Sequence, residues 1–78
     1  NEKFRVFPNP SNKGIITIKA SSVPTSVTVY SILGETVKET NANSTTVRVN
    51  TIDFTKRIYF VSLSFENGQK LTKKIVIN

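Results

Sequence analysis

Residues 58–78, IYFVSLSFENGQKLTKKIVIN, contain the pattern that decides the fold. Side chains alternate in the first eight positions, and one face carries the apolar Tyr59, Val61, Leu63 and Phe65. The opposite face begins with two apolar side chains and ends with two serines. Asn67-Gly68 is a strong hairpin signal, because both residue types tolerate positive φ. The segment therefore predicts a β-hairpin whose first strand, apolar on much of both faces, lies inside a sheet.

Alternating runs separated by turn residues recur along the rest of the chain. They predict seven strands, at Phe4–Phe7, Ile15–Ala20, Val27–Tyr30, Thr36–Thr40, Thr45–Asn50, Ile58–Phe65 and Gln69–Ile77. Short strands at a spacing of about 8–12 residues are typical of an all-β sandwich. The stretch NTIDFTK at 50–56 predicts a connection that crosses between sheets. We expect a single domain over residues 1–78, an Ig-like β-sandwich of about seven antiparallel strands.

The composition excludes several kinds of chemistry. The chain has no cysteine and no histidine, so it offers no disulfide, thiol nucleophile or imidazole ligand. No apolar run approaches the roughly 20 residues that span a bilayer. The chain starts with neither a signal peptide nor an initiator methionine, so it is expected to be a piece of a longer protein.

The remaining polar groups do not suggest an active site. Glu35 and Glu39 share a strand face, but this face is the solvent side of a predicted hairpin. Asp53 and Glu66 are isolated in predicted loops. A carboxylate pair or a metal cluster needs side chains that converge, which this spacing does not predict. We expect no enzyme, no metal site and no cofactor.

The charge balance is strongly basic. Eleven Lys and Arg against five Asp and Glu give a net charge of +6, which suits nucleic acid, an anionic membrane surface or an acidic partner. Most of these cations are spread, as on solvated strand faces; only Lys70, Lys73 and Lys74 concentrate, with no acid after Glu66. Nucleic-acid binding would need exposed aromatic rings along a basic groove. Here the aromatic residues alternate with aliphatic ones as core side chains do, so no specific nucleic-acid binding is expected.

Three ordered segments carry a family resemblance. VFPNPSNKG at 6–14 leads into IITI at 15–18; VTVYSILGETV at 27–37 follows, and residues 58–78 form the last segment. In this order and spacing they resemble the C-terminal sorting domains of cargo proteins of the type IX secretion system, found in certain Gram-negative bacteria. The resemblance covers essentially the whole chain from Phe4 to Asn78.

The resemblance implies that the domain itself is a sorting signal. Members of this family are seven-stranded Ig-like sandwiches placed last in a larger secreted protein. The cargo crosses the inner membrane with its own signal peptide and folds in the periplasm. The outer-membrane translocon and its shuttle components then recognise the C-terminal domain, so that the cargo reaches the cell surface or the medium. A sortase-like cysteine peptidase at the surface commonly removes the domain and joins the cargo to an anionic lipopolysaccharide.

Carried over by position, the family's motifs fall on few residues of this chain. They are Pro8, Asn9 and Pro10 in the opening, Gly34 in the middle turn, and Gly68 with Lys70, Lys73 and Lys74 near the end. One position departs from the family, which has glycine shortly before the IY pair. Here that neighbourhood is Lys56-Arg57-Ile58-Tyr59, which predicts another backbone path if that glycine had positive φ.

A physical hypothesis for recognition follows from the last strand. A positive strip is formed by Lys70, Lys73 and Lys74 together with the exposed backbone of the final hairpin. The hypothesis is that the translocon binds this strip. The alternative is that edge lysines only prevent strand-to-strand aggregation. At the level of function, the alternative to a sorting signal is a non-catalytic Ig-like module that binds carbohydrate or protein beside an extracellular enzyme. The chain has no tryptophan and no row of exposed aromatics of the kind that carbohydrate modules use, which favours the sorting signal.

Overall fold

The structure is a computed structural model, and it describes residues 3–8 and 14–78. Its strands are β1 (Phe4–Phe7), β2 (Ile15–Ala20), β3 (Ser26–Ser31), β4 (Thr36–Asn41), β5 (Thr46–Asn50), β6 (Ile58–Ser64) and β7 (Lys70–Val76). All seven predicted strands are present, and their bounds differ from the prediction by at most one residue. The described residues contain no helix, so the all-β prediction is confirmed.

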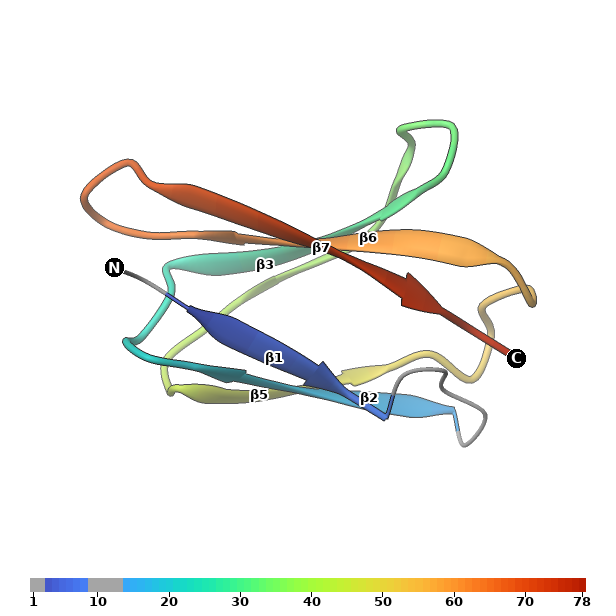
Figure 1. Cartoon of the computed structure of the whole chain (residues 1–78), viewed down its shortest axis with the longest axis horizontal. Helices are drawn as coiled ribbons and strands as arrows, with labels where there is room; N and C mark the ends of the chain where they lie inside the picture. The colour runs from blue at the N-terminus through green and yellow to red at the C-terminus, as the bar shows by residue number, and fades with distance from the viewer. Residues whose placement is uncertain (1–2, 9–13) are drawn as a thin grey trace.

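The strands form two sheets packed face to face (Figure 1). One sheet has the order β1-β2-β5 and the other has the order β4-β3-β6-β7, and every pairing is antiparallel. This arrangement is that of an Ig-like sandwich, with β4 beside β3 rather than beside β5. Each sheet is open, so four strands are edges: β1 and β5 in the first sheet, β4 and β7 in the second.

The core lies between the two sheets, on the inward positions of their strands. Its buried apolar side chains are at most 6% exposed: Phe4, Ile16, Ile18, Val27, Val29, Val49, Tyr59, Val61, Leu63, Phe65, Ile75 and Ile77. Alternate positions supply them, because successive side chains on a strand point to opposite faces. β4 supplies none, and nearly all of its side chains are exposed.

β6 is a central strand, as its two apolar faces predict. It pairs with β3 on one side and with β7 on the other. Its inward side chains Tyr59, Val61 and Leu63 are buried, and on its outward face Ser62 is also buried, at 2% exposed. Ser62 lies between Thr28 of β3 and Thr72 of β7, so a small side chain fits between its cross-strand neighbours.

Two hairpins, β3–β4 and β6–β7, turn in the same way. Gly34 N–H donates to the Ser31 carbonyl and Ser31 N–H to the Glu35 carbonyl; Gly68 N–H likewise donates to the Phe65 carbonyl. In each turn the glycine has positive φ, 89° at Gly34 and 87° at Gly68, and no other residue type among those described does. The β6–β7 hairpin is therefore confirmed, but its turn has three residues and uses positive φ only at the glycine.

The connection from β5 to β6 crosses between the sheets, as predicted. Thr51 N–H donates to the Gly14 carbonyl over 2.8 Å and Phe54 N–H to the Thr51 carbonyl over 2.9 Å. The Phe54 ring packs on that of Tyr59, with centroids 5.1 Å apart, and the Tyr59 hydroxyl donates to the Thr55 carbonyl. The connection keeps negative φ before Ile58, so the residues that replace the family's glycine follow an ordinary backbone path.

Two leucines test where the stability of the fold comes from. Leu63 is fully buried in β6, whereas Leu33 is 78% exposed at the β3–β4 turn. We expect Leu63→Ala to lower the free energy of unfolding by about 2–5 kcal/mol, because it leaves a cavity in the core. Leu33→Ala is expected to change it by less than about 0.5 kcal/mol. Urea unfolding of both variants measures this, and equal losses would contradict the assigned core.

The β6–β7 turn makes a second prediction. Gly68→Ala is expected to cost about 1–2 kcal/mol, because only glycine adopts positive φ without strain. Asn67→Ala removes a single exposed hydrogen bond, from Gln69 N–H to Asn67 Oδ1, and is expected to cost about 0.5–1 kcal/mol. Thermal unfolding of the two variants compares them. A larger loss at Asn67 would point to a two-residue turn with positive φ at both positions.

Candidate functional site

The side of the sandwich between β1 and β7 is its most distinctive surface. These strands are edges of different sheets, and they lie on the same side of the molecule (Figure 1). Two adjoining hollows lie between them, lined by residues 3–7 on one side and 71–74 on the other, with Arg5 and Lys73 common to both. We call this surface the β1–β7 cleft. It is formed by residues that lie far apart in the sequence.

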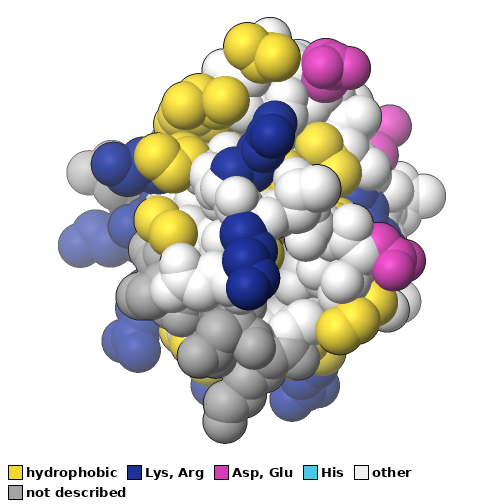
Figure 2. All heavy atoms as spheres, turned by 90° about the vertical axis from the view of Figure 1, so that its right-hand side faces the viewer, with side chains coloured by type: hydrophobic (Ala, Val, Ile, Leu, Met, Phe, Trp, Pro, Cys, Tyr) yellow, Lys and Arg dark blue, Asp and Glu magenta, His cyan; other side chains and the backbone are white. Residues whose placement is uncertain are grey.

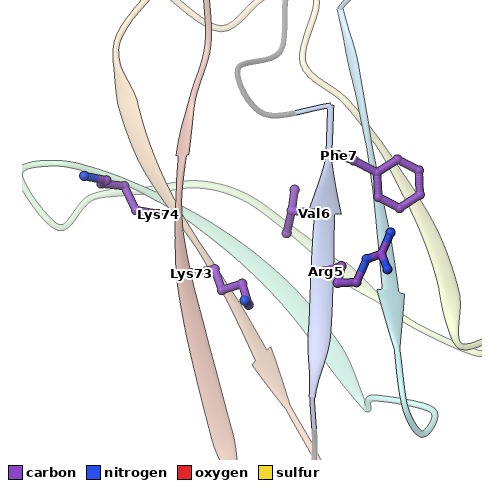
Figure 3. Close-up of a pocket in the computed structure, with 5 residues that line it drawn as sticks. All are labelled: Arg5, Val6, Phe7, Lys73 and Lys74. Atoms are coloured by element: carbon purple, nitrogen blue, oxygen red, sulfur yellow. The ribbon is translucent and has the colours of Figure 1, made fainter.

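Side chains enter the β1–β7 cleft from alternate positions of each strand. In Figure 3, Lys73 and Val6 point into the gap between the strands, Lys74 points away from β1, and Arg5 and Phe7 point away from β7. Alternation along the two strands explains this, because neighbouring residues face opposite sides of a sheet. The cleft therefore has an inner wall of core-facing side chains and outer rims of polar and basic ones.

Lys73 occupies a core-facing position that its neighbours fill with apolar side chains. Leu71 is partly buried and Ile75 is fully buried on the same face of β7. The Lys73 Nζ lies 5.7 Å from the centroid of the Phe4 ring, which is a cation–π contact across the two sheets. Its aliphatic stem covers apolar surface while the ammonium group reaches solvent, so the cation is held at the mouth of the core.

Some backbone hydrogen-bonding groups of β7 and β1 point away from the strands with which they pair. Phe65 N–H bonds to the Gln69 carbonyl and Ile77 N–H to the Arg57 carbonyl, so the bonded positions of β7 are the odd-numbered ones. Because bonded and non-bonded pairs alternate in an antiparallel ladder, the N–H and C=O of Lys70 and Thr72 point away from β6. On β1, Ser21 N–H bonds to the Lys3 carbonyl, and the same alternation turns the backbone groups of Phe4 and Val6 away from β2.

Charge is segregated around the molecule. Lys3, Arg5 and Lys73 line one hollow, and no acidic side chain lines either one in the part of the chain that the structure describes. The described acids lie elsewhere, at the β3–β4 hairpin, the β5–β6 connection and the β6–β7 turn: Glu35, Glu39, Asp53 and Glu66. In Figure 2 the acidic side chains gather on the right of the view, whereas the left edge shows only Lys and Arg among its charged side chains.

The described residues hold no other kind of site of the two considered below: a metal cluster and a membrane-spanning helix. Among residues 3–8 and 14–78, no three acidic side chains gather where a metal ion could bind. Over this same range, no helix is long and apolar enough to cross a membrane.

The structure brings together only some of the residues carried over from the family motifs. Lys73 and Lys74 line the β1–β7 cleft, and Lys70 begins the same strand, so the predicted basic strip lies on an edge. Pro8 directly follows β1 and is exposed, whereas Asn9 and Pro10 lie outside the described residues. The two glycines are separated, because the β3–β4 and β6–β7 turns occupy opposite ends of the sandwich (Figure 1).

The first strand supplies the residues that sequence reasoning missed. Lys3 and Arg5 line the cleft opposite Lys73, and Phe4 forms its inner wall. Their alternation marks Phe4 as core-facing and Arg5 as exposed, which could have been read from the sequence. That β1 and β7 are edges on the same side depends on how seven strands divide between two sheets, and no local pattern contains that information.

Fold and cleft together define a class of protein, an Ig-like sandwich with a basic cleft between two edge strands. The family model of the secretion system C-terminal sorting domain matches residues 5–78. The chain belongs to this family, whose members are the sorting domains of type IX secretion. The resemblance of the three motif segments is therefore confirmed.

A curated relative gives the match a context. The chain is 32% identical over 75 residues to the endo-acting ulvan lyase of Formosa agariphila, which covers 94% of this chain and 14% of the lyase. This chain thus spans about 14% of the length of the relative it matches. No solved structure matches the chain.

Family membership fixes the coarse function. The domain is a non-catalytic type IX sorting signal, as the family resemblance predicted. A sorting domain of this system implies export of the protein that carries it to the cell surface or the extracellular space.

Proposed function

We propose that this chain is the C-terminal sorting domain of a larger cargo protein and that the outer-membrane translocon and its shuttle components bind its β1–β7 side. The observation that carries the proposal is the cleft itself, where two edge strands meet around Lys3, Arg5 and Lys73. A partner can recognise a folded sorting domain only through side chains and backbone groups at its surface. Edge strands with outward backbone groups and aligned cations offer both hydrogen bonds and charge to a partner.

The route and the fate of the domain are part of the proposal. The cargo passes through the periplasm, where this domain folds, and then crosses the outer membrane. A sortase-like cysteine peptidase at the surface removes the domain, as the family resemblance implies. The match to a small fraction of a much longer relative supports a domain attached to a large protein.

The candidate recognition residues divide into two groups. Lys70, Lys73 and Lys74 are exposed side chains of an edge strand. Pro8, Gly34 and Gly68 lie at the end of a strand or in turns, where backbone geometry accounts for their identity. We therefore propose that the lysines contact the translocon, whereas Pro8 and the two glycines shape the domain; Asn9 and Pro10 lie outside the described residues.

A secretion assay tests the proposal. Residues 1–78 are fused to the C-terminus of a periplasmic reporter in a host that has type IX secretion, and surface and periplasmic fractions are compared. We expect the wild-type fusion to reach the surface. A folded reporter that stays in the periplasm would overturn the proposed function.

Charge reversal in the same secretion assay tests which residues of the domain are recognised. The double variant Lys73→Glu, Lys74→Glu is expected to trap the reporter in the periplasm, because it makes the last strand repel an acidic partner. The matched control is Lys38→Glu with Lys56→Glu, which changes net charge equally at exposed positions on β4 and on the β5–β6 connection. Normal export of the first variant, with both variants folded by circular dichroism, would refute recognition through the lysines.

A further inference from the structure

We infer that the β1–β7 cleft binds an extended acidic segment of a partner protein, which adds as a further strand to the outer edge of β7 at residues 70–72. This inference deepens the proposed function and rests on it, because it names the chemistry of the partner that binds the same side. It concerns the part of the cleft next to Lys3, Phe4 and Thr72.

The backbone of β7 is suited to receive a strand. The outward N–H and C=O of Lys70 and Thr72 repeat at the two-residue spacing that an added strand matches. Main-chain hydrogen bonds of this kind supply affinity in β-strand addition, and pockets for alternate side chains supply specificity. Gln69 and Leu71 already bond toward β6, so a guest strand needs no rearrangement of the existing ladder.

The walls of the cleft specify what the guest carries on its two faces. Toward the core, the guest meets the Phe4 ring and the partly buried Leu71, which suit an apolar side chain. Toward solvent, it lies beside the β1 rim that carries Lys3 and Arg5, while Lys73 stands at the mouth of the core. An alternating acidic and apolar segment satisfies both faces at once.

The charge distribution selects acidic guests over basic ones. The hollow beside Phe4 is lined by three cations and, among the described residues, by no carboxylate. Bringing another cation between Lys3, Arg5 and Lys73 would add like-charge repulsion, which suppresses wrong partners. The same repulsion explains how an open edge avoids pairing with a second copy of this basic chain, since edge lysines oppose such pairing.

Peptide titration followed by ¹⁵N–¹H NMR tests the inference on the 78-residue chain. The probe is a capped heptapeptide that alternates glutamate and valine; the controls are its lysine–valine counterpart and a glutamate–valine peptide N-methylated on alternate backbone nitrogens. We expect the acidic peptide to shift the amide signals of Thr72 and Phe4, and neither control to bind. Binding of the lysine peptide, shifts confined to the β3–β4 hairpin, or an undiminished effect of the methylated peptide would each overturn the inference.

Variants of the chain make the same test from the other side. Thr72→Pro removes an outward N–H that the β6–β7 ladder does not use, and edge strands tolerate proline at such positions. We expect it to abolish peptide binding, whereas Thr72→Ala, which keeps that N–H, retains it. Lys73→Glu is expected to weaken binding about tenfold, with Lys38→Glu as the control that leaves it unchanged. Unchanged affinity in Lys73→Glu would overturn the inference.

The peptide titration and the secretion assay can fail independently, so that they test the further inference and the proposed function separately. Peptide binding is measured without a secretion host, so its absence overturns the strand-addition inference and leaves the export result standing. Loss of export with intact peptide binding would instead overturn the proposed function. If Thr72→Pro does not fold, the methylated peptide tests the same hydrogen bonds on the unaltered chain.

Discussion

The burial of β6 is the constraint on which the rest of this structure depends. Tyr59, Val61 and Leu63 are at most 3% exposed, and they face the opposite sheet from the middle of their own. At about 25 cal/mol per Å² of apolar surface, such a strand carries a large share of the stability of a chain this small. β6 is flanked by β3 and β7, and β7 is the last strand of this sheet.

The recognition surface that we propose lies at the edge that β7 forms. β7 anchors itself through Ile75, at 0% exposure, and presents lysines at positions that do not hold the core together. Lys73 is the exception to the apolar pattern of its face, since it stands between Leu71 and Ile75 in the alternation. Departures from local consistency concentrate at functional sites, and this one lies where the first and last strands face each other. Along β7, the residues that stabilise the core therefore lie next to the exposed lysines that we propose for recognition.

Much of this fold could be predicted from the sequence, because alternation and turn chemistry are local. The seven strands, the central position of β6, and the crossing connection at 50–56 all follow from period-2 patterns and turn residues. Turn geometry was less accessible: Asn67-Gly68 suggested positive φ at both residues, yet only Gly68 has it, because a three-residue loop closes the hairpin. The predicted hairpin around Gly34 also places β4 beside β3, as the structure confirms.

Only the β7 side of the candidate site could be predicted from the sequence. Lys70, Lys73 and Lys74 stand out in the sequence as a cluster of cations without acids. Their partners across the cleft, Lys3, Phe4 and Arg5, are about seventy positions away, and only the division of strands between sheets brings them near. The composition of an edge strand does not indicate which strand of the other sheet lies across from it. Comparison with the family identified the coarse function, whereas the geometry supports the surface that we propose for recognition.

Recognition on the β1–β7 side is tested most directly by the reactivity of single cysteines. The chain has no cysteine, so Arg5→Cys, Lys73→Cys and Lys38→Cys each introduce one unique thiol at an exposed position. Each variant is fused to the reporter, and its reaction with a maleimide is measured free and while the translocon holds the fusion. We expect the translocon to protect the thiols at positions 5 and 73, one on each side of the cleft, and to leave the thiol at position 38 on β4 reactive. Protection at position 38 alone, or equal protection at all three positions, would contradict recognition through the β1–β7 cleft.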